Sequence, residues 1–194
     1  MTDVVRLEWR HGAPDLSGVR AGDAVELTGR VLTLRDASAA RLARAIEAGD
    51  ALPLPLAGQI LYAVGPSPAK PGQIIGSAGP TTTARMSRYF PSLFASGVRA
   101  VIGKGELHGD DMATFTANGV VYFAAIGGLG ALLARHITAA TIVAYEELGP
   151  EALYALDVAS FPAVTIIDTT GRNFHEEARR KWALTDPESR PQRP

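Results

Sequence analysis

The stretch Gly76–Met86 reads GSAGPTTTARM, and it lies between an apolar run and a helical pattern. Glycine lets the backbone approach a ligand closely, and Pro80 presets the first turn of a helix. The hydroxyls of Thr81–Thr83 then stand beside the free N–H groups of the helix start, an end that attracts anions. Because Arg85 follows Thr81 by four residues, we expect the two to share a helix face. The stretch predicts a site for a carboxylate or phosphate, beside a hydroxyl that could move a proton.

The residues before this stretch indicate short strands and one helix. Strand patterns cover Val4–Trp9, Val25–Leu34 and Gln59–Val64. A helix pattern covers Ala37–Ala48, with Asp36 as its predicted N-cap. Tight turns rich in glycine and proline favour antiparallel pairing in this first third of the chain.

Strands alternate with helices over the rest of the chain. Strand patterns cover residues 73–77, 98–103, 119–125, 138–145 and 163–168, and helix patterns cover residues 81–90, 110–118, 126–135, 150–155 and 173–182. Such alternation implies right-handed parallel units, whose ligands bind at the carboxyl ends of the strands. The sequence therefore predicts an α/β fold, a mixed sheet with a parallel βα portion from about residue 73 to 168. We expect residues 1–182 to form a single domain and residues 183–194, which contain three prolines, to be a disordered tail.

The composition excludes several classes of function. The chain has 194 residues, 46% of them hydrophobic, and a net charge of −1, so nothing favours nucleic acid or a membrane surface as partner. It has no cysteine, which excludes disulfides, thiol catalysis and any thiolate-held zinc or iron–sulfur cluster supplied by this chain. The four histidines are scattered without the spacing of metal ligands. We expect a soluble, cytoplasmic protein.

Two further cations stand where predicted strands end. Arg35 follows Val25–Leu34, and its side chain could hold a carboxylate or form a salt bridge to Asp36 or another acid. Lys104 lies between two glycines after another strand, and it could be a second charge for an anion or an exposed loop lysine. The threonines could likewise only cap a helix. Together these residues suit a small dianion, but they include neither an electrophile nor an evident strong base. The chain either only binds its ligand or works with a partner.

Several motifs, in order along the chain, resemble one family of enzymes. They are Ala57–Met86, Ile102–Gly105, Val121–Gly128, Val143–Gly149 and Phe161–Val164. Over about residues 20–175 the chain resembles the β subunit of class I iron–sulfur fumarate hydratases, a family that includes the β subunit of L(+)-tartrate dehydratase. The resemblance implies a swivelling β/β/α fold and a hydro-lyase that hydrates fumarate to L-malate.

The resemblance also implies a division of labour between two subunits. A cysteine-bearing α subunit would hold a [4Fe–4S] cluster, whose open iron acts as Lewis acid on the substrate hydroxyl, in an assembly such as α2β2. By motif match, Arg35, Thr82, Arg85 and Lys104 would bind the substrate dicarboxylate. Thr81 would be the catalytic base, or its relay, at the carbon that bears the proton.

The chain departs from the family pattern at two positions. Ala84 stands where the family usually has glycine, and Ser87 where it usually has aspartate, which affects the expected loop mobility and substrate choice. The hairpin Gly65–Gly72 looks more like the fumarate branch than the tartrate branch. Besides fumarate, the alternatives are tartrate, another hydroxy-dicarboxylate such as a methyl-substituted malate, and a non-catalytic module that binds dicarboxylates.

Overall fold

The computed structural model of the chain describes residues 4–9 and 13–183. The strands are β1 (Val5–Glu8), β2 (Ala24–Leu34), β3 (Ile60–Ala63), β4 (Ala100–Gly103), β5 (Val121–Ala124), β6 (Ile137–Ala144) and β7 (Leu153–Ile167). The α-helices are α1 (Asp36–Ala48), α2 (Phe90–Ala95), α3 (Gly109–Ala117), α4 (Gly130–Ala134) and α5 (Phe174–Trp182). Two 3-10 helices, η1 (Thr83–Tyr89) and η2 (Glu146–Glu151), complete the described elements.

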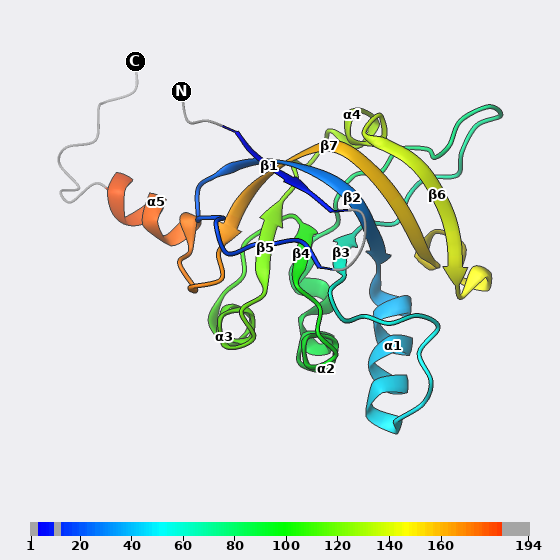
Figure 1. Cartoon of the computed structure of the whole chain (residues 1–194), viewed down its shortest axis with the longest axis horizontal. Coiled ribbons are helices and arrows are strands. Elements are labelled where there is room, and N and C mark those ends of the chain that lie inside the picture. The colour runs from blue at the N-terminus through cyan, green and yellow to red at the C-terminus, as the bar shows by residue number, and fades with distance from the viewer. Residues whose placement is uncertain (1–3, 10–12, 184–194) are drawn as a thin grey trace, which may run out of the picture.

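The strands form one sheet, part of which closes into a barrel (Figure 1). The strand order is β1-β2-β3-β4-β5-β7-β6, and β7 also pairs with β2, so the circuit β2-β3-β4-β5-β7 closes on itself. The pairs from β1 to β5 are parallel, whereas β7 is antiparallel to β2, β5 and β6. The 15-residue length of β7 makes the closure possible. Along one edge it follows β2, and along the other it pairs first with β6 and then with β5.

Side chains from the strands of the barrel form the first of two apolar cores. All four residues of β3 are buried, and alternation along the strand sends Ile60 and Tyr62 to this core. Phe161 of β7 packs there with its ring edge-on to Tyr62, at 5.3 Å between ring centroids. Leu133 of α4 joins the same core. These contacts explain why the barrel strands read as nearly continuous apolar runs.

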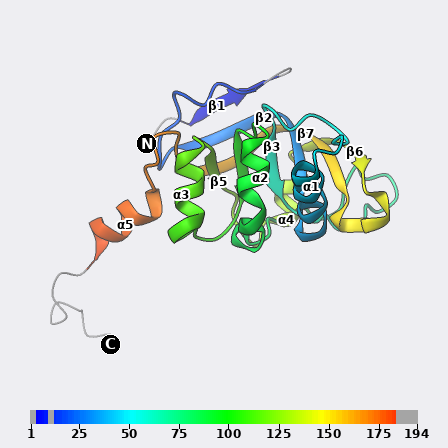
Figure 2. The same cartoon turned by 90° about the horizontal axis from the view of Figure 1, so that it is seen from below.

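The second core lies between the sheet and three helices. Figure 2 shows α1, α2 and α3 side by side on one face of the sheet. Leu42 of α1 is buried here, as are Phe90 and Phe94 of α2 and Phe115 of α3. The ring of Phe115 meets the rings of Phe90 and Phe94 edge-on, at 5.2 and 4.8 Å between centroids. This layer fixes the start of α1 and the segment that precedes α2, where the predicted site residues lie.

The predicted α/β class with a mixed sheet is confirmed, but its parallel strands occupy other parts of the chain. β1, β2 and β3 are parallel, not antiparallel as the tight turns of the first third suggested. β6 and β7 are antiparallel, although the predicted parallel portion included them. The physical reason is that α1 supplies the crossover between β2 and β3, while η2 is short enough for β6 to fold back directly onto β7.

Three local predictions are wrong. Residues 73–77 form no strand, because the proline-rich loop keeps them out of the sheet. Residues 150–155 are not a helix, since η2 ends at Glu151 and β7 starts at Leu153, continuing without a break through the strand predicted at 163–168. The N-cap of α1 is Arg35, and Asp36 is the first helical residue.

The predicted helix over residues 81–90 begins later and changes type. Thr81 lies outside any helix, Thr82 is extended, and the 3-10 helix η1 starts at Thr83. The expectation that Thr81 shares a helix face with Arg85 is therefore wrong. Residues 184–194 of the predicted tail lie outside the described residues. Among residues 4–9 and 13–183, every helix is too short to cross a membrane.

Candidate functional site

The predicted site residues lie where neighbouring parallel strands end. Arg35 directly follows β2, and Lys104 directly follows β4. Between these two strands lies β3, and the backbone N–H of Thr81 donates to the carbonyl of Ala63, its last residue, at 2.7 Å. Because parallel strands end at a common edge, the fold gathers all three segments there. We call this edge, with Arg35, Thr81, Thr82, Arg85 and Lys104, the site edge.

The threonine segment is hydrogen-bonded to the end of β4 through its backbone. The N–H of Lys104 donates to the carbonyl of Thr81 at 3.3 Å, and the N–H of Thr83 donates to the carbonyl of Lys104 at 3.0 Å. This parallel bridge sets Thr82 opposite Lys104. The side chain of Thr82 is exposed and makes no capping hydrogen bond, so simple N-capping does not explain it.

Thr83 has a different role from its two neighbours, because its side chain points into the protein. It is fully buried, and its hydroxyl lies 3.1 Å from the hydroxyl of Tyr122, which donates to the carbonyl of Gly105 at 2.9 Å. A β-carbon on Gly103 would collide with Thr83 Oγ1, so only glycine fits there. Thr83 anchors the segment that carries Thr81 and Thr82.

Hydroxyls of two buried tyrosines form hydrogen bonds that hold this segment in place. Tyr62 donates to the carbonyl of Ala78 at 2.5 Å, just before the threonines. Burial raises the pKa of Tyr62 well above its usual value, and burial raises the pKa of Tyr122 to about 12, opposed by the hydrogen bond with Thr83. Both phenols therefore stay protonated at neutral pH. They act as fixed hydrogen-bond donors and not as acid–base groups.

The two arginines of the site edge meet at one carboxylate. Arg85 Nε lies 3.3 Å from Asp36 Oδ1, and Arg85 Nη2 lies 3.1 Å from Asp36 Oδ2. Arg35 Nε lies 3.5 Å from the same Oδ2, and Arg35 Nη2 lies 3.1 Å from Glu151 Oε1. The salt-bridge alternative for Arg35 is thus present in the structure, and through Asp36 it brings Arg35 and Arg85 together.

The structure divides the predicted residues into two groups. The first is Thr81, Thr82 and Lys104, joined by backbone hydrogen bonds, and the second is Arg35 and Arg85, joined by Asp36. A backbone hydrogen bond from the N–H of Arg85 to the carbonyl of Thr82, at 3.3 Å, joins the two groups, but in the part of the chain that the structure describes no hydrogen bond or ion pair between their side chains does so. Asp36 and Glu151 were not predicted as site residues. Asp36 looked like a helix cap, and Glu151 lies 116 residues from Arg35 with no local signal to link them.

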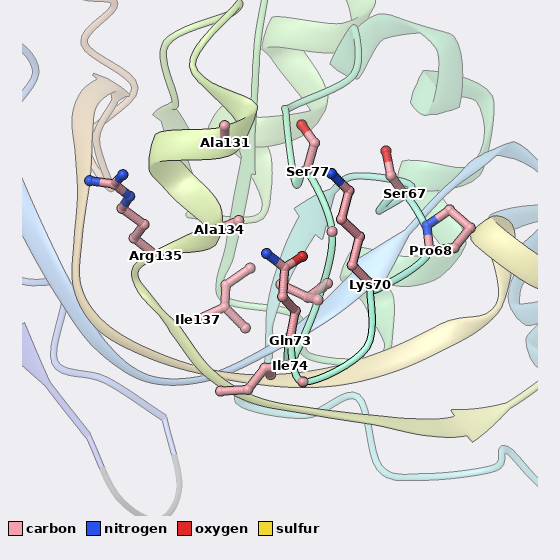
Figure 3. A pocket seen from close by; sticks show the side chains of 13 residues that line it. Ser67, Pro68, Lys70, Gln73, Ile74, Ser77, Ala131, Ala134, Arg135 and Ile137 are labelled. Atoms are coloured by element: carbon pink, nitrogen blue, oxygen red, sulfur yellow. The ribbon is translucent and has the colours of Figure 1, made fainter.

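A cavity of about 780 Å³ lies between the proline-rich loop and the region of α4 (Figure 3). One wall is the proline-rich loop, with Ser67, Lys70 and Ser77, and the other is α4 with Arg135. None of the five predicted site residues lines it. Next to the cavity, the loop touches the start of α4 through a hydrogen bond from the N–H of Ala78 to the carbonyl of Gly130 at 3.0 Å.

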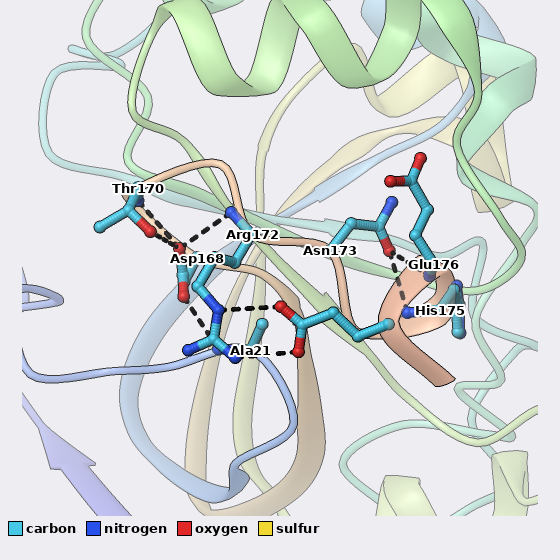
Figure 4. Close-up of polar contacts among 8 residues, drawn as sticks. Ala21, Asp168, Thr170, Arg172, Asn173, His175 and Glu176 are labelled. Atoms are coloured by element: carbon cyan, nitrogen blue, oxygen red, sulfur yellow. Dashed lines mark hydrogen bonds and ion pairs between the residues drawn. The ribbon is translucent and has the colours of Figure 1, made fainter. Parts of the chain in front are cut away.

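A second polar cluster, around Asp168, belongs to the fold and not to the site edge (Figure 4). This buried carboxylate accepts hydrogen bonds from the N–H groups of Ala21, Thr170 and Arg172 and from the Thr170 hydroxyl, at 2.6–3.2 Å. Burial raises the pKa of Asp168, but these hydrogen bonds together outweigh it and hold the pKa below its usual value. Next to it, Asn173 caps α5 by accepting from the N–H groups of His175 and Glu176.

The described residues do not form a metal site. Residues 4–9 and 13–183 contain no group of three or more histidine, cysteine, aspartate or glutamate side chains placed to hold a metal ion. The side chains gathered at the site edge are cations, hydroxyls and two paired carboxylates. They can bind an anion and handle a proton, and they do not supply the ligands of a metal.

The chain is similar to proteins from archaea and bacteria. It is 34% identical over 173 residues to the protein named "Putative L(+)-tartrate dehydratase subunit beta" of Methanocaldococcus jannaschii, covering 86% of this chain and 89% of that protein. It is 33% identical over 168 residues to "Fumarate hydratase class I, anaerobic" of Escherichia coli, covering 86% of this chain and 31% of that enzyme. "Putative fumarate hydratase class I" of Geobacillus stearothermophilus is 35% identical over 167 residues, with 84% and 32% covered.

The chain thus spans most of the archaeal subunit but only about a third of the two fumarate hydratases. Its residues 2–178 match the family described as "Fumarase C-terminus". This match covers the barrel, the helix layer and the whole site edge. The chain therefore belongs to the fumarase C-terminus family of hydro-lyases.

Proposed function

We propose that the chain is the β-type subunit of an iron–sulfur hydro-lyase that reversibly hydrates fumarate to L-malate. In this proposal it supplies the carboxylate-binding and proton-transfer side of a shared active site. The observation that carries the proposal is the site edge itself, where a member of this family gathers three cations and two threonines at adjacent strand ends. Residues 1–182 would form its catalytic domain.

The cations suit a substrate with two carboxylates. A guanidinium presents paired N–H donors that match a carboxylate, whereas the lysine ammonium acts as a compact charge. Arg35 and Arg85 would hold one carboxylate and Lys104, with the Thr82 hydroxyl, would hold the other. Because these cations lie on separate segments of the site edge, they would bind the two carboxylates at opposite ends of a four-carbon dianion.

Thr81 would transfer the proton at the carbon between the carboxylates. A threonine hydroxyl is a weak acid, so it needs nearby positive charge to act as a base or relay. The backbone hydrogen bonds between the threonine segment and Lys104 keep such a charge on the adjoining segment. Thr83 cannot serve in this role, because its hydroxyl is buried against Tyr122.

A [4Fe–4S] cluster does not fit the residues of this chain, which lacks cysteine. We propose that a cysteine-bearing α subunit holds it, in an assembly such as α2β2, where it would supply a Lewis acid for the substrate hydroxyl. The name of the archaeal relative, a subunit beta, supports a partner.

L(+)-tartrate is the second candidate substrate, with dehydration to oxaloacetate. The archaeal relative that this chain covers over 89% of its length carries the name of a tartrate dehydratase β subunit. Tartrate is also a four-carbon dianion, so the same cations would hold it, and the choice would depend on how the added hydroxyl is accommodated.

The test is reconstitution of the full chain with a cysteine-bearing partner, sought first in the neighbouring reading frame. We expect the two chains to copurify. Under anaerobic conditions we expect the mixture to hydrate fumarate, and neither chain to do so by itself. Turnover of tartrate but not of fumarate would show that L(+)-tartrate, the second candidate, is the substrate. Dicarboxylate binding without turnover in any mixture would contradict an enzymatic role.

Thr81→Ala tests the proton-transfer role in the assembled enzyme. We expect kcat to fall by about 10²- to 10⁴-fold, the usual contribution of a positioned acid–base group, while KM changes little. Thr81→Ser keeps the hydroxyl and should retain most of the activity. Equal activity of the alanine and serine variants would remove Thr81 from the mechanism.

A further inference from the structure

We propose that Asp36 is a positioning residue, which fixes both arginines of the site edge in the orientation that binds the substrate carboxylate. This inference rests on the proposed function, because it concerns how the same site binds its dianion. Asp36 need not touch the substrate. It acts by holding Arg35 and Arg85, the two side chains that are proposed to contact the substrate.

The contacts of Asp36 leave part of each guanidinium free. Arg85 Nε donates to Asp36 Oδ1 at 3.3 Å, and Arg85 Nη2 lies 3.1 Å from Asp36 Oδ2 as an ion-pair contact. Arg35 Nη2 donates to Glu151 Oε1 at 3.1 Å, whereas Arg35 Nε lies 3.5 Å from Asp36 Oδ2 and makes no hydrogen bond. A guanidinium has five N–H donors, so each arginine keeps donors for another carboxylate.

Charge explains why a carboxylate is needed at this place. Two guanidinium groups near one another repel, and the repulsion grows as water is excluded. The carboxylate of Asp36 lies between Arg35 and Arg85 and offsets this cost. The side chain of Arg85 is 53% exposed, so without this contact it would sample many rotamers, whereas Arg35 keeps a second partner in Glu151.

The start of α1 does not account for the direction of this carboxylate. An aspartate in the first turn often accepts from a free backbone N–H. Here other groups serve the helix start. Glu151 Oε2 accepts from the N–H of Ala37 at 2.8 Å, and Ser38 Oγ accepts from the N–H of Arg35 at 3.0 Å. Within the described residues, the contacts of the Asp36 carboxylate all go to Arg35 and Arg85.

The first experiment measures the anchoring itself, by hydrogen exchange of arginine Nε–H groups in NMR spectra of the full chain. The control is Asp157→Asn, because Asp157 also pairs with the Nε and Nη2 groups of an arginine, Arg30, at 2.7 and 3.0 Å, away from the site edge. We expect Asp36→Asn to speed exchange at Arg85 by about tenfold or more and to leave Arg30 unchanged, and Asp157→Asn to do the reverse. Equal exchange at Arg85 in the wild type and in Asp36→Asn would overturn the proposal.

The second experiment measures the consequence for substrate binding in the assembled enzyme. We expect Asp36→Asn to raise KM about tenfold while kcat stays within about threefold, since Thr81 is not disturbed. In an Arg85→Ala background, the same substitution should change KM less than about twofold, because Arg85 is already gone and Glu151 still holds Arg35. Asp157→Asn should not change KM.

Three kinetic results would overturn the proposal: an unchanged KM in Asp36→Asn, additive effects of the two substitutions, or a lower KM. A lower KM would mean that Asp36 competes with the substrate for the arginines. Asp36→Glu keeps the charge and should restore much of the wild-type KM, and it replaces the asparagine variant if that variant does not fold. If the assembled wild-type enzyme acts on neither fumarate nor tartrate, the proposed function fails, whereas the exchange experiment still decides whether Asp36 holds Arg85.

Discussion

Two arginine–aspartate pairs of the molecule look alike but stand in different surroundings. Arg30–Asp157 joins β2 to β7, and Arg85–Asp36 joins η1 to the start of α1. The first pair makes two hydrogen bonds, and the second makes one hydrogen bond and one ion-pair contact; the arginine side chains are 61% and 53% exposed. Arg30 and Asp157 are also direct partners in the strand register, whereas no strand pairing joins Arg85 to Asp36. In the barrel the backbone pairing sets the geometry, so we expect the ion pair to add little there, whereas our proposal gives the pair at the site edge a positioning role.

The largest expected difference between the two pairs comes from replacing each arginine in turn. We expect Arg85→Ala to lower kcat/KM of the assembled enzyme by about 100-fold or more, since a charged hydrogen bond to a substrate carboxylate is lost. Arg30→Ala should leave kcat/KM within about twofold, because Arg30 lies in the barrel wall. Both are measured by steady-state hydration of fumarate. Equal losses in the two variants would mean that Arg85 has no special role at the site.

The tight packing of Gly103 against Thr83 can be compared with that of a glycine without close neighbours. Gly103→Ala would push a methyl group into Thr83, and we expect about 2 kcal/mol lower stability toward urea, typical of overpacking. Gly18→Ala is the matched control, because nothing lies within 4 Å of the added carbon, and we expect a change of less than about 0.5 kcal/mol. Similar unfolding midpoints for both variants would show that Thr83 can move aside at little cost.

Asp168 and Asp157 allow a buried and an exposed carboxylate to be compared as the pH changes. Both have lowered pKa values, Asp157 through its hydrogen bond with Arg30. A lowered folded-state pKa stabilises the protein above the unfolded-state value, about 3.9, and this contribution is lost as the pH falls through the folded-state pKa. We expect Asp168→Asn to cost about 1.5 kcal/mol at pH 7, with the difference from wild type shrinking below about pH 4.

Unfolding in urea at several pH values measures this difference, with Asp157→Asn as the exposed reference. For that reference we expect a cost of less than about 0.5 kcal/mol at pH 7. A difference for Asp168→Asn that stays constant down to the acid limit would show that the loss is one of packing and not of charge.

The smallest expected effect concerns a single hydroxyl below the site edge. Tyr122→Phe removes the donor to the Gly105 carbonyl and the partner of Thr83, and we expect a loss of about 1 kcal/mol. Tyr154→Phe is the control, because its hydroxyl is exposed and bonds Gly149 at 3.3 Å. Thermal unfolding compares the two. Equal melting temperatures would contradict the anchoring role given to Tyr122.

The sequence was sufficient to predict where the site residues lie but not how they are held. Arg35 and Lys104 follow apolar strands, and that local pattern places each at the carboxyl end of its strand. The acid that anchors Arg35 from the other side, Glu151, is distant in sequence and joins it only through the closed barrel. The role of Thr83 could not be predicted for a similar reason. It is the same residue type as Thr81, and only the fold shows that its hydroxyl is buried against Tyr122.

The strand directions show a second limit of local patterns. Short turns suggested antiparallel pairs in the first third, but β1 and β2 are parallel, and so are β2 and β3, between which α1 forms the crossover. The length of β7 was also not readable, because Ser160 and Pro162 interrupt its apolar pattern while the strand continues through them. Both features depend on contacts between the first and last parts of the chain.

The closure of β2 onto β7 has a consequence for how the protein folds. The pairing Ala24↔Val164 joins residues that are separated by most of the chain, and the adjoining register extends this contact to Leu32↔Ala155. Such distant contacts raise the contact order, which slows folding because a long loop must close before any pairing energy is gained. On the ribosome, β2 is made early but must wait for β7 to emerge before the barrel closes. Arg35 receives its Glu151 anchor only at that stage, so a nascent chain gains an ordered site edge late in its synthesis.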